Sequence, residues 1–312
     1  MTAADDIEHA RSALAAIPFL ANEDASGLRI TRLGGLTNLV FRLDLGGRSY
    51  CLRIPGKGTE EYIDRRNEEQ AARAAAQADV SPAVLHFDSR TGVMVTSFIS
   101  GAVTMTPELF KTRSNAPERA GRAFRRLHDS RSEFPFRFEL FSMIDGYLKV
   151  LGGKNVDFPP GYYDLLEESG AVRSALQAHE LPLVACHCDP LCENFLDTGE
   201  RMWIVDWEYS GMNDPMWDLG DLSVEGGFDE EQEERMIEAY FSGRPRASDM
   251  GRIVIYKAMC DLLWTLWGLI QFANENPADD FWSYSLNRFN RCRALMSQAE
   301  FARHVEAVRR GG

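Results

Sequence analysis

Hydrophobic periodicity changes once along the chain, close to residue 100, and this change limits the fold more than any other feature. Across residues 28–54 apolar and polar residues alternate, and glycine pairs interrupt the pattern twice. Alternation between glycine turns predicts three antiparallel strands. A helix-favouring stretch at 62–78 and a further alternating pair at 84–98 follow, so a small sheet with one helix should end near Ser100.

Beyond Ser100 the apolar spacing is mainly helical, apart from a strand-rich insert at 183–207. We predict an α+β chain of two domains, residues 1–100 with an antiparallel sheet and residues 101–312 mostly helical. A short amphipathic helix at 5–20 should precede the first strand. The helices expected in the second domain cover residues 117–129, 141–151, 162–179, 230–241, 253–272 and 281–309.

The net charge and the cysteines limit which partners and which cellular compartment are compatible with the sequence. The formal net charge of -13 repels polyanions, so we expect no extended nucleic-acid binding, although a single nucleotide is compatible with it.

The start of the chain lacks the pattern of an export signal, and the apolar stretch at 262–272 is too short to cross a bilayer, so it predicts a buried helix. Six cysteines, three of them clustered, favour the reducing cytoplasm. The sequence indicates no oligomeric state.

The insert at 183–207 carries a pattern suited to metal chemistry. A turn at 198–200 folds its apolar arms into a hairpin, and Asn194 and Asp206 lie six residues on either side of Glu200. Both should therefore emerge at the open end of the hairpin. Asp189 lies on the loop that feeds the same end. Carboxylate and amide oxygens suit Mg²⁺, which binds through one or two carboxylates together with substrate phosphates.

Two simpler readings of this segment stay open at this point. Asp206 could merely end a strand, and Asn194 could merely cap a turn. A zinc site is the other alternative, since Cys and His are usual zinc ligands. Three of the candidate ligands are consecutive, however, and consecutive residues of a strand point to opposite faces, so they do not easily surround one zinc ion as a tetrahedron. The zinc candidates are Cys186, His187, Cys188 and Cys192.

The spacing of Asp189, Asn194 and Asp206 resembles the catalytic-loop Asp, the Asn five residues later and the metal-binding Asp of kinases. His187-x-Asp189, with the run Val205-Asp206-Trp207-Glu208, is similar to the choline/ethanolamine kinase and aminoglycoside phosphotransferase group, and to its bacterial choline kinase branch in particular. The resemblance implies a bilobal protein-kinase-like fold that uses ATP and Mg²⁺. It implies that Asp189 accepts the substrate proton and that Asn194 and Asp206 bind the metal.

The first lobe fits the same resemblance. The segment Gly34-Gly35-Leu36-Thr37-Asn38 resembles the loop that covers the nucleotide phosphates, where glycine lets the backbone approach closely. Arg53 stands on the third strand where protein kinases place Lys, and choline-kinase-like proteins are similar in having Arg there. Glu68 resembles its acidic helix partner, with Glu69 as the alternative. The implied nucleotide-binding residues are Gly34, Gly35, Thr37, Asn38, Arg53 and Glu68.

The late helix suggests a substrate class. Trp264 and Trp267 are three residues apart, hence on one helix face, and two indoles could wall a quaternary ammonium by cation–π contact. The alternative is that both are core residues. Choline kinases have a similar Trp pair, and Glu225 resembles their acidic pocket residue; Glu208 completes the expected substrate-binding set.

The sequence leaves alternatives both for the substrate and for the function. Gly226-Gly227-Phe228 stands where eukaryotic choline kinases have further aromatics, which leaves ethanolamine, another amino alcohol or thiamine as alternatives to choline. Aminoglycoside phosphorylation and a non-catalytic nucleotide-binding module are the rival functions.

Overall fold

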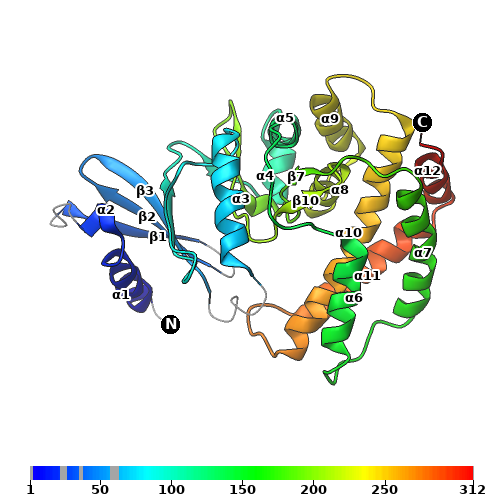
Figure 1. Cartoon of the computed structure of the whole chain (residues 1–312), viewed down its shortest axis with the longest axis horizontal. Coiled ribbons are helices and arrows are strands. Elements are labelled where there is room, and N and C mark those ends of the chain that lie inside the picture. The colour runs from blue at the N-terminus through cyan, green and yellow to red at the C-terminus, as the bar shows by residue number, and fades with distance from the viewer. Residues whose placement is uncertain (1–2, 22–26, 35–37, 57–62, 312) are drawn as a thin grey trace.

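The structure is a computed structural model that describes residues 3–21, 27–34, 38–56 and 63–311. Its smaller part is built on a five-stranded antiparallel sheet in the order β1-β2-β3-β5-β4. These strands are β1 (Arg29–Gly34), β2 (Leu39–Leu45), β3 (Arg48–Ile54), β4 (Val84–Phe87) and β5 (Met94–Ser97). Helices α1 (Ala3–Leu14), α2 (Pro18–Ala21) and α3 (Arg65–Gln77) accompany the sheet (Figure 1).

The tight turn between β2 and β3 depends on glycine. Gly46 and Gly47 have φ angles of 57° and 76°, and the flanking residues Leu45 and Arg48 pair across the turn. Two consecutive residues with positive φ form the turn that matches the right-handed twist of a hairpin. The glycine pair seen in the sequence therefore fixes the register that carries Arg53 into its place opposite Val40.

The larger part is mainly helical and extends to the C-terminus at the other end of the molecule (Figure 1). Its helices are α4 (Pro107–Thr112), α5 (Ala116–His128), α6 (Leu140–Leu151), α7 (Tyr162–Ala178), α8 (Met216–Glu225), α9 (Glu230–Phe241), α10 (Ala247–Ala273), α11 (Phe281–Met296) and α12 (Ala299–Arg310). The antiparallel sheet followed by helices confirms the predicted α+β class. The division of the chain at about residue 100 stays a prediction.

Short strands lie between the helices. The strands β6 (Val103–Thr104), β8 (Phe195–Asp197) and β9 (Met202–Ile204) form one sheet, and β7 (Val184–Cys186) pairs with β10 (Gly211–Asn213). The hairpin β8–β9 is the one that the turn at 198–200 predicts. A single 3-10 turn, η3 (Cys192–Asn194), leads into it.

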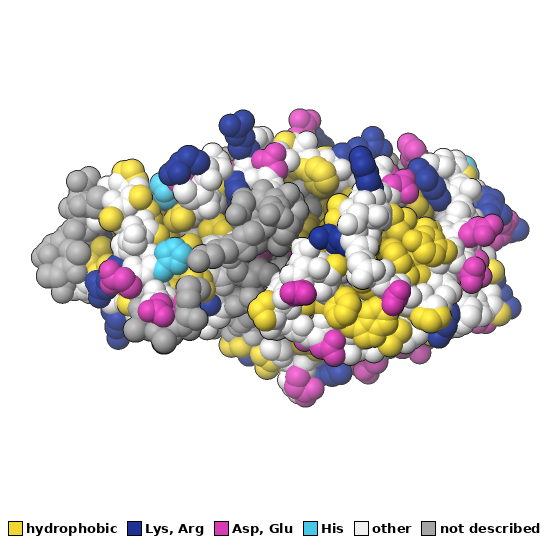
Figure 2. All heavy atoms as spheres, turned by 90° about the horizontal axis from the view of Figure 1, so that it is seen from below, with side chains coloured by type: hydrophobic (Ala, Val, Ile, Leu, Met, Phe, Trp, Pro, Cys, Tyr) yellow, Lys and Arg dark blue, Asp and Glu magenta, His cyan; other side chains and the backbone are white. Residues whose placement is uncertain are grey.

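Helix α10 is the centre of the larger core, and α6, α8, α11 and α12 pack against it. It is long and apolar enough to cross a membrane by length and composition, but 78% of its most apolar window is buried inside the protein. The burial confirms the prediction of a core helix. On the face seen in Figure 2, acidic and basic side chains are interspersed, and hydrophobic ones gather over the helical part.

Two of the predicted helices are each divided in the structure, and two further helices were not predicted. The helix expected at 5–20 is two helices, and the one expected at 281–309 breaks at Ser297 and Gln298, where Gln298 is extended with ψ 139° and precedes α12. Helix α8 escaped prediction because residues 216–223 are buried on every side, so its sequence shows no polar stripe. Helix α4 was missed because it has only six residues.

Close packing of α5 on α9 supplies a stability test. A Cβ atom on Gly121 would collide with the backbone carbonyl of Met236, whereas one on Gly170, which is exposed in α7, would meet nothing within 4 Å. We expect Gly121→Ala to lower the melting temperature by several degrees, because packed backbone cannot move aside cheaply. Gly170→Ala is the matched control and should stabilise by about 1 kcal/mol. Equal melting temperatures for the two variants would contradict this packing.

Candidate active site

The β8–β9 hairpin brings the three sequence-predicted chemical residues to one place. The backbone N–H of Val205 donates to the carbonyl of Asn194 at 2.9 Å, which closes the open end of the hairpin and brings Asn194 beside the residue before Asp206. The side-chain Nδ2 of Asn194 donates to the backbone carbonyl of Asp189 at 3.0 Å. The loop and both hairpin arms are thereby joined, as the spacing predicted.

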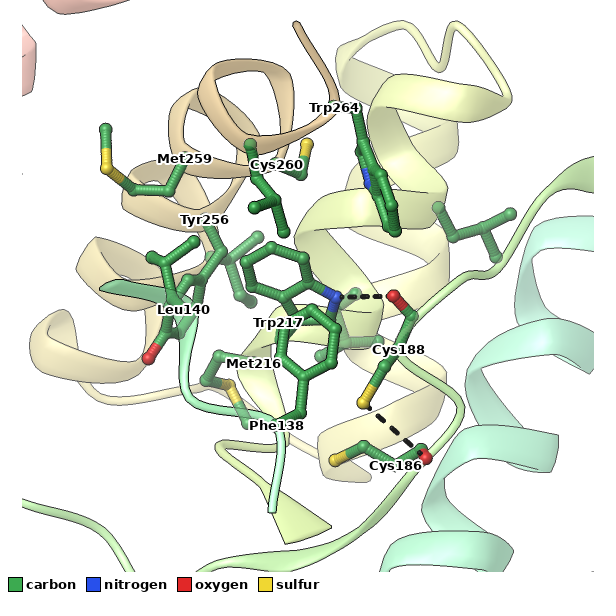
Figure 3. Close-up of a cluster of buried hydrophobic side chains, with 14 of the residues drawn as sticks. Phe138, Leu140, Cys186, Cys188, Met216, Trp217, Tyr256, Met259, Cys260 and Trp264 are labelled. Carbon is green, nitrogen blue, oxygen red and sulfur yellow. Dashed lines mark hydrogen bonds between the residues drawn. The ribbon is translucent and has the colours of Figure 1, made fainter. Parts of the chain in front are cut away.

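A buried carboxylate holds the loop that carries Asp189. Asp218 on α8 accepts the backbone N–H groups of His187 and Cys188, each at 2.8 Å, and pairs with His128 at 3.1 Å. Trp217 Nε1 donates to the Cys188 carbonyl at 3.1 Å (Figure 3). Because Cys188 has a φ of 67°, these bonds stabilise a backbone conformation that non-glycine residues rarely adopt. The loop is preorganised from α8.

Asp206 also has a left-handed backbone, with a φ of 69°. The next residue, Trp207, is buried and anchored by its Nε1, which donates to Ser81 Oγ at 3.0 Å. His187 packs its ring edge-on against Trp207 and bonds the Val205 carbonyl at 2.9 Å. Strain of this kind persists where neighbouring contacts determine the conformation, and it is typical of functional sites.

Arg53 on β3 joins the sheet to this loop. Its guanidinium forms a salt bridge with Glu68 on α3, and its Nη1 lies 3.2 Å from Asp206 and 3.3 Å from Glu208. The alternative partner, Glu69, pairs instead with Arg73 at 2.9 Å. Arg53 therefore pairs with two carboxylates that follow the hairpin, Asp206 and Glu208, and with Glu68 on the helix of the smaller part.

A second arginine supports the cluster. Arg65 Nη1 lies 2.7 Å from Glu68 and 2.6 Å from Glu208. Oxygens of Glu68, Asp206 and Glu208 lie within 4.8 Å of one another, so two arginines serve three carboxylates. We call these five residues the interlobe charge cluster. If all are ionised, it carries one surplus negative charge.

The residues expected to cover the nucleotide phosphates lie partly outside the described residues. Asn38 Nδ2 lies 3.3 Å from both Asp206 and Glu208, and its Oδ1 accepts the N–H of Gly56 at 3.3 Å. Gly34 ends β1, and a side chain there would meet nothing within 4 Å among the residues that the structure describes. Gly35 and Thr37 lie outside the described residues. Asn38 thus connects the end of this loop to the charge cluster.

Burial and mutual repulsion raise the pKa values of two carboxyl groups in the site, those of Asp189 and Asp206. Burial, together with the nearby carboxylates of Glu225 and Asp206, raises the pKa of Asp189 to about 8. Burial also raises the pKa of Asp206 to about 7, with Glu208 adding to the rise and Arg53 opposing it. Raised carboxyl pKa values mean that cations bound nearby would stabilise the ionised forms.

The oxygen donors fit a hard divalent cation. Asp206 is the most open carboxylate of the charge cluster, with 30% of its side chain exposed against 0% for Glu68 and 8% for Glu208. Since Asn194 uses its amide nitrogen on Asp189, its Oδ1 oxygen remains available as a ligand. One carboxylate and one amide oxygen, completed by water and phosphate, match Mg²⁺.

The residues expected to bind substrate have different neighbours in the structure. Glu225 on α8 forms a salt bridge with Arg288 on α11. Trp264 is 4% exposed and meets the ring of Tyr209 at 5.6 Å, whereas Trp267 packs with Phe281 and Tyr284. Glu208 belongs to the charge cluster. The two indoles therefore have different ring neighbours, and their part in substrate binding stays a prediction.

The comparisons with known proteins identify the family. A model of the phosphotransferase enzyme family matches residues 29–250. The crystal structure of a choline/ethanolamine kinase family protein from Mesorhizobium loti is 65% identical, with a TM-score of 0.90 over 98% of this chain and 100% of that one. The chain belongs to the choline/ethanolamine kinase family of phosphotransferases. It is accordingly a kinase-fold phosphotransferase whose acceptor is an alcohol group.

Two structures of more distant members agree with this assignment. The choline kinase LicA from Streptococcus pneumoniae is 26% identical, with a TM-score of 0.76 over 93% of this chain and all of that one. A LicA structure in complex with AMP is 25% identical, with a TM-score of 0.73 over 94% of this chain and 98% of that one. That relative therefore binds a nucleotide.

The sequence analysis did not identify three residues whose side chains hold the site residues in place. Arg65 precedes Glu68 by three residues, a helical spacing that could have predicted their pairing. Asp218 acts through backbone N–H groups that no sequence pattern displays. Arg288 lies in the last part of the chain, where no resemblance guided the prediction.

The charge cluster can be tested through stability. Arg65→Met leaves Glu68 and Glu208 with one fewer cation in a buried setting, and we expect a loss of roughly 3–5 kcal/mol in the free energy of unfolding. Adding Glu208→Gln should recover part of this loss, because the second change removes the uncompensated charge. Denaturant titration of the two single variants and the double variant measures the coupling. Strictly additive losses would contradict the pairing of Arg65 with Glu208.

Proposed function

We propose that this protein is a Mg²⁺- and ATP-dependent kinase that phosphorylates the hydroxyl group of choline or a closely related amino alcohol. The observation that carries the proposal is the concentration of carboxylates around Asp189. Asp189 is repelled by Glu225, Asp206 and Glu208, and the largely buried setting of Glu225 and Glu208 screens their charges poorly. A metal ion on one side and a cationic substrate on the other would balance this charge.

Each residue has a definite part in the proposed reaction. Asp189 orients the substrate hydroxyl and accepts its proton as the oxygen attacks the γ-phosphorus of ATP. A bond forms between the substrate oxygen and phosphorus, the bond from the γ-phosphorus to the bridging oxygen breaks, and ADP leaves. Asn194 and Asp206 would hold Mg²⁺, which neutralises charge on the phosphates.

The sheet side would hold the nucleotide. We propose that Arg53, fixed by Glu68, contacts the phosphates, and that Gly34, Gly35, Thr37 and Asn38 cover them. The salt bridge of Arg53 with Glu68, and the contact of Asn38 with Asp206, support this arrangement. Because positioning and charge stabilisation do most of the work of phosphoryl transfer, a fixed guanidinium is well suited to it.

A small cationic substrate suits the helical side better than a large one. We propose that Trp264, Trp267 and Glu225 form part of its binding site. The edge-on ring contact between Trp264 and Tyr209 supports an enclosed aromatic wall, which favours a compact ammonium head over a polycationic sugar. We also propose a cytoplasmic setting, which the six free cysteines support.

The direct test is ATP consumption with choline, ethanolamine, thiamine and kanamycin measured in parallel, in the wild type and in Asp189→Asn. We expect turnover with choline or ethanolamine and little with kanamycin. Asp189→Asn keeps the shape but removes the base, so kcat should fall on the order of 10²–10⁴-fold while ATP affinity is retained. Turnover of kanamycin alone, or near-normal kcat in the variant, would refute the assignment.

A further inference from the structure

Asp221 is an unexplained buried carboxyl next to the proposed substrate site. It lies on α8 with 0% of its surface exposed, and neither of its carboxyl oxygens has a hydrogen-bond partner of normal geometry among the described residues. Leaving a buried acid without hydrogen bonds is costly, so such a group needs a compensating partner. The Cys260 thiol is close enough to act on it, but a thiol is a weak donor.

Helix register directs Asp221 toward the substrate site. Trp217, Asp221 and Glu225 follow one another at four-residue steps, so they share one face of α8. On α10 the same steps connect Tyr256, Cys260 and Trp264, and α8 packs against α10.

The two helix faces meet in matching order. The rings of Trp217 and Tyr256 meet at 5.5 Å, and Asp221 lies next to Cys260. Figure 3 shows Trp217, Tyr256, Cys260 and Trp264 gathered in this interface. By the same register, Glu225 and Trp264 follow at the next step of each helix, and Glu225 is near enough to Cys260 to act on its thiol, so Asp221 precedes Glu225 by one helical turn.

Two other carboxylates of this region, Glu225 and Asp261, already have cations. Arg288 forms salt bridges with Glu225 and, at 3.1 Å, with Asp261, and Arg291 also binds Asp261. Two arginines thus serve two carboxylates. Asp221 is left over, because Arg288, whose charge also reaches it, is already bonded to Glu225 and Asp261, while Glu225 and Asp189 are near enough to repel its charge.

We propose that Asp221 is the counter-charge of the substrate ammonium group and determines the preference for cationic over neutral alcohols. This inference rests on the proposed function. An ammonium group that enters between Glu225 and Asp189 supplies the positive charge that Asp221 lacks. Glu225, because Arg288 already neutralises it, shapes the site more than it selects for charge.

The test compares choline with its neutral carbon isostere, in which a tert-butyl group replaces the trimethylammonium. In the wild type kcat/KM should strongly favour choline. In Asp221→Asn, which is nearly isosteric, KM for choline should rise about tenfold or more, because one partner of a buried charge pair is lost. The KM for the isostere and for ATP should stay within about twofold, and so should kcat.

Two controls separate charge recognition from folding. Glu234→Gln removes the same charge from an exposed position on α9 and should leave the preference for choline unchanged. The melting temperature of Asp221→Asn should not fall, since the change removes a buried acid without hydrogen bonds. If Asp221→Asn does not fold, Asp221→Ala provides the same comparison.

The outcomes distinguish this inference from the function on which it rests. If the wild type phosphorylates choline or ethanolamine and Asp221→Asn keeps the full preference over the neutral isostere, Asp221 is only a protonated core residue and the inference is overturned. If the wild type phosphorylates neither amino alcohol, the proposed function itself fails. A selective loss of preference in Asp221→Asn, with normal use of ATP, supports the inference.

Discussion

The contact of Arg53 with Asp206 and Glu208 is the interaction on which the rest of the site depends. It joins a strand of the antiparallel sheet to the end of the β8–β9 hairpin, and Glu68 and Arg65 complete it. Five charged groups come together there with one more carboxylate than cation. A cluster of this kind is most stable when a further cation binds, because the interior screens charge poorly.

The same imbalance recurs on the helical side. Glu225 and Asp261 share Arg288 and Arg291, while Asp221 has no cation of its own and Asp189 lies within reach of both Glu225 and Asp206. The loop with Asp189 lies between two acidic regions, and one would take a metal ion with nucleotide phosphates, the other an ammonium group. Because Asp218 fixes this loop through backbone N–H groups, Asp189, the proposed proton acceptor, keeps its position between them.

Local spacing predicted the parts of this site that depend on local geometry. The turn at 198–200 was enough to place Asn194 and Asp206 together, since a hairpin of known turn fixes its own register. The choice of Glu68 over Glu69 followed from resemblance and agrees with the salt bridge. Contacts between segments distant in sequence were harder to predict, because local spacing does not fix them. The pairing of Glu225 with Arg288 joins residues 63 positions apart, and the separate ring neighbours of Trp264 and Trp267 depend on Tyr209 and on α11.

The central claim is that the interlobe charge cluster binds nucleotide through a metal ion held by Asp206. Calorimetric titration of ATP into the wild type and Asp206→Ala, each with Mg²⁺ and with EDTA, tests it most directly. We predict that Mg²⁺ strengthens ATP binding in the wild type and has little effect in Asp206→Ala, whose melting temperature should stay close to that of the wild type. An equal gain from Mg²⁺ in both proteins would contradict the account.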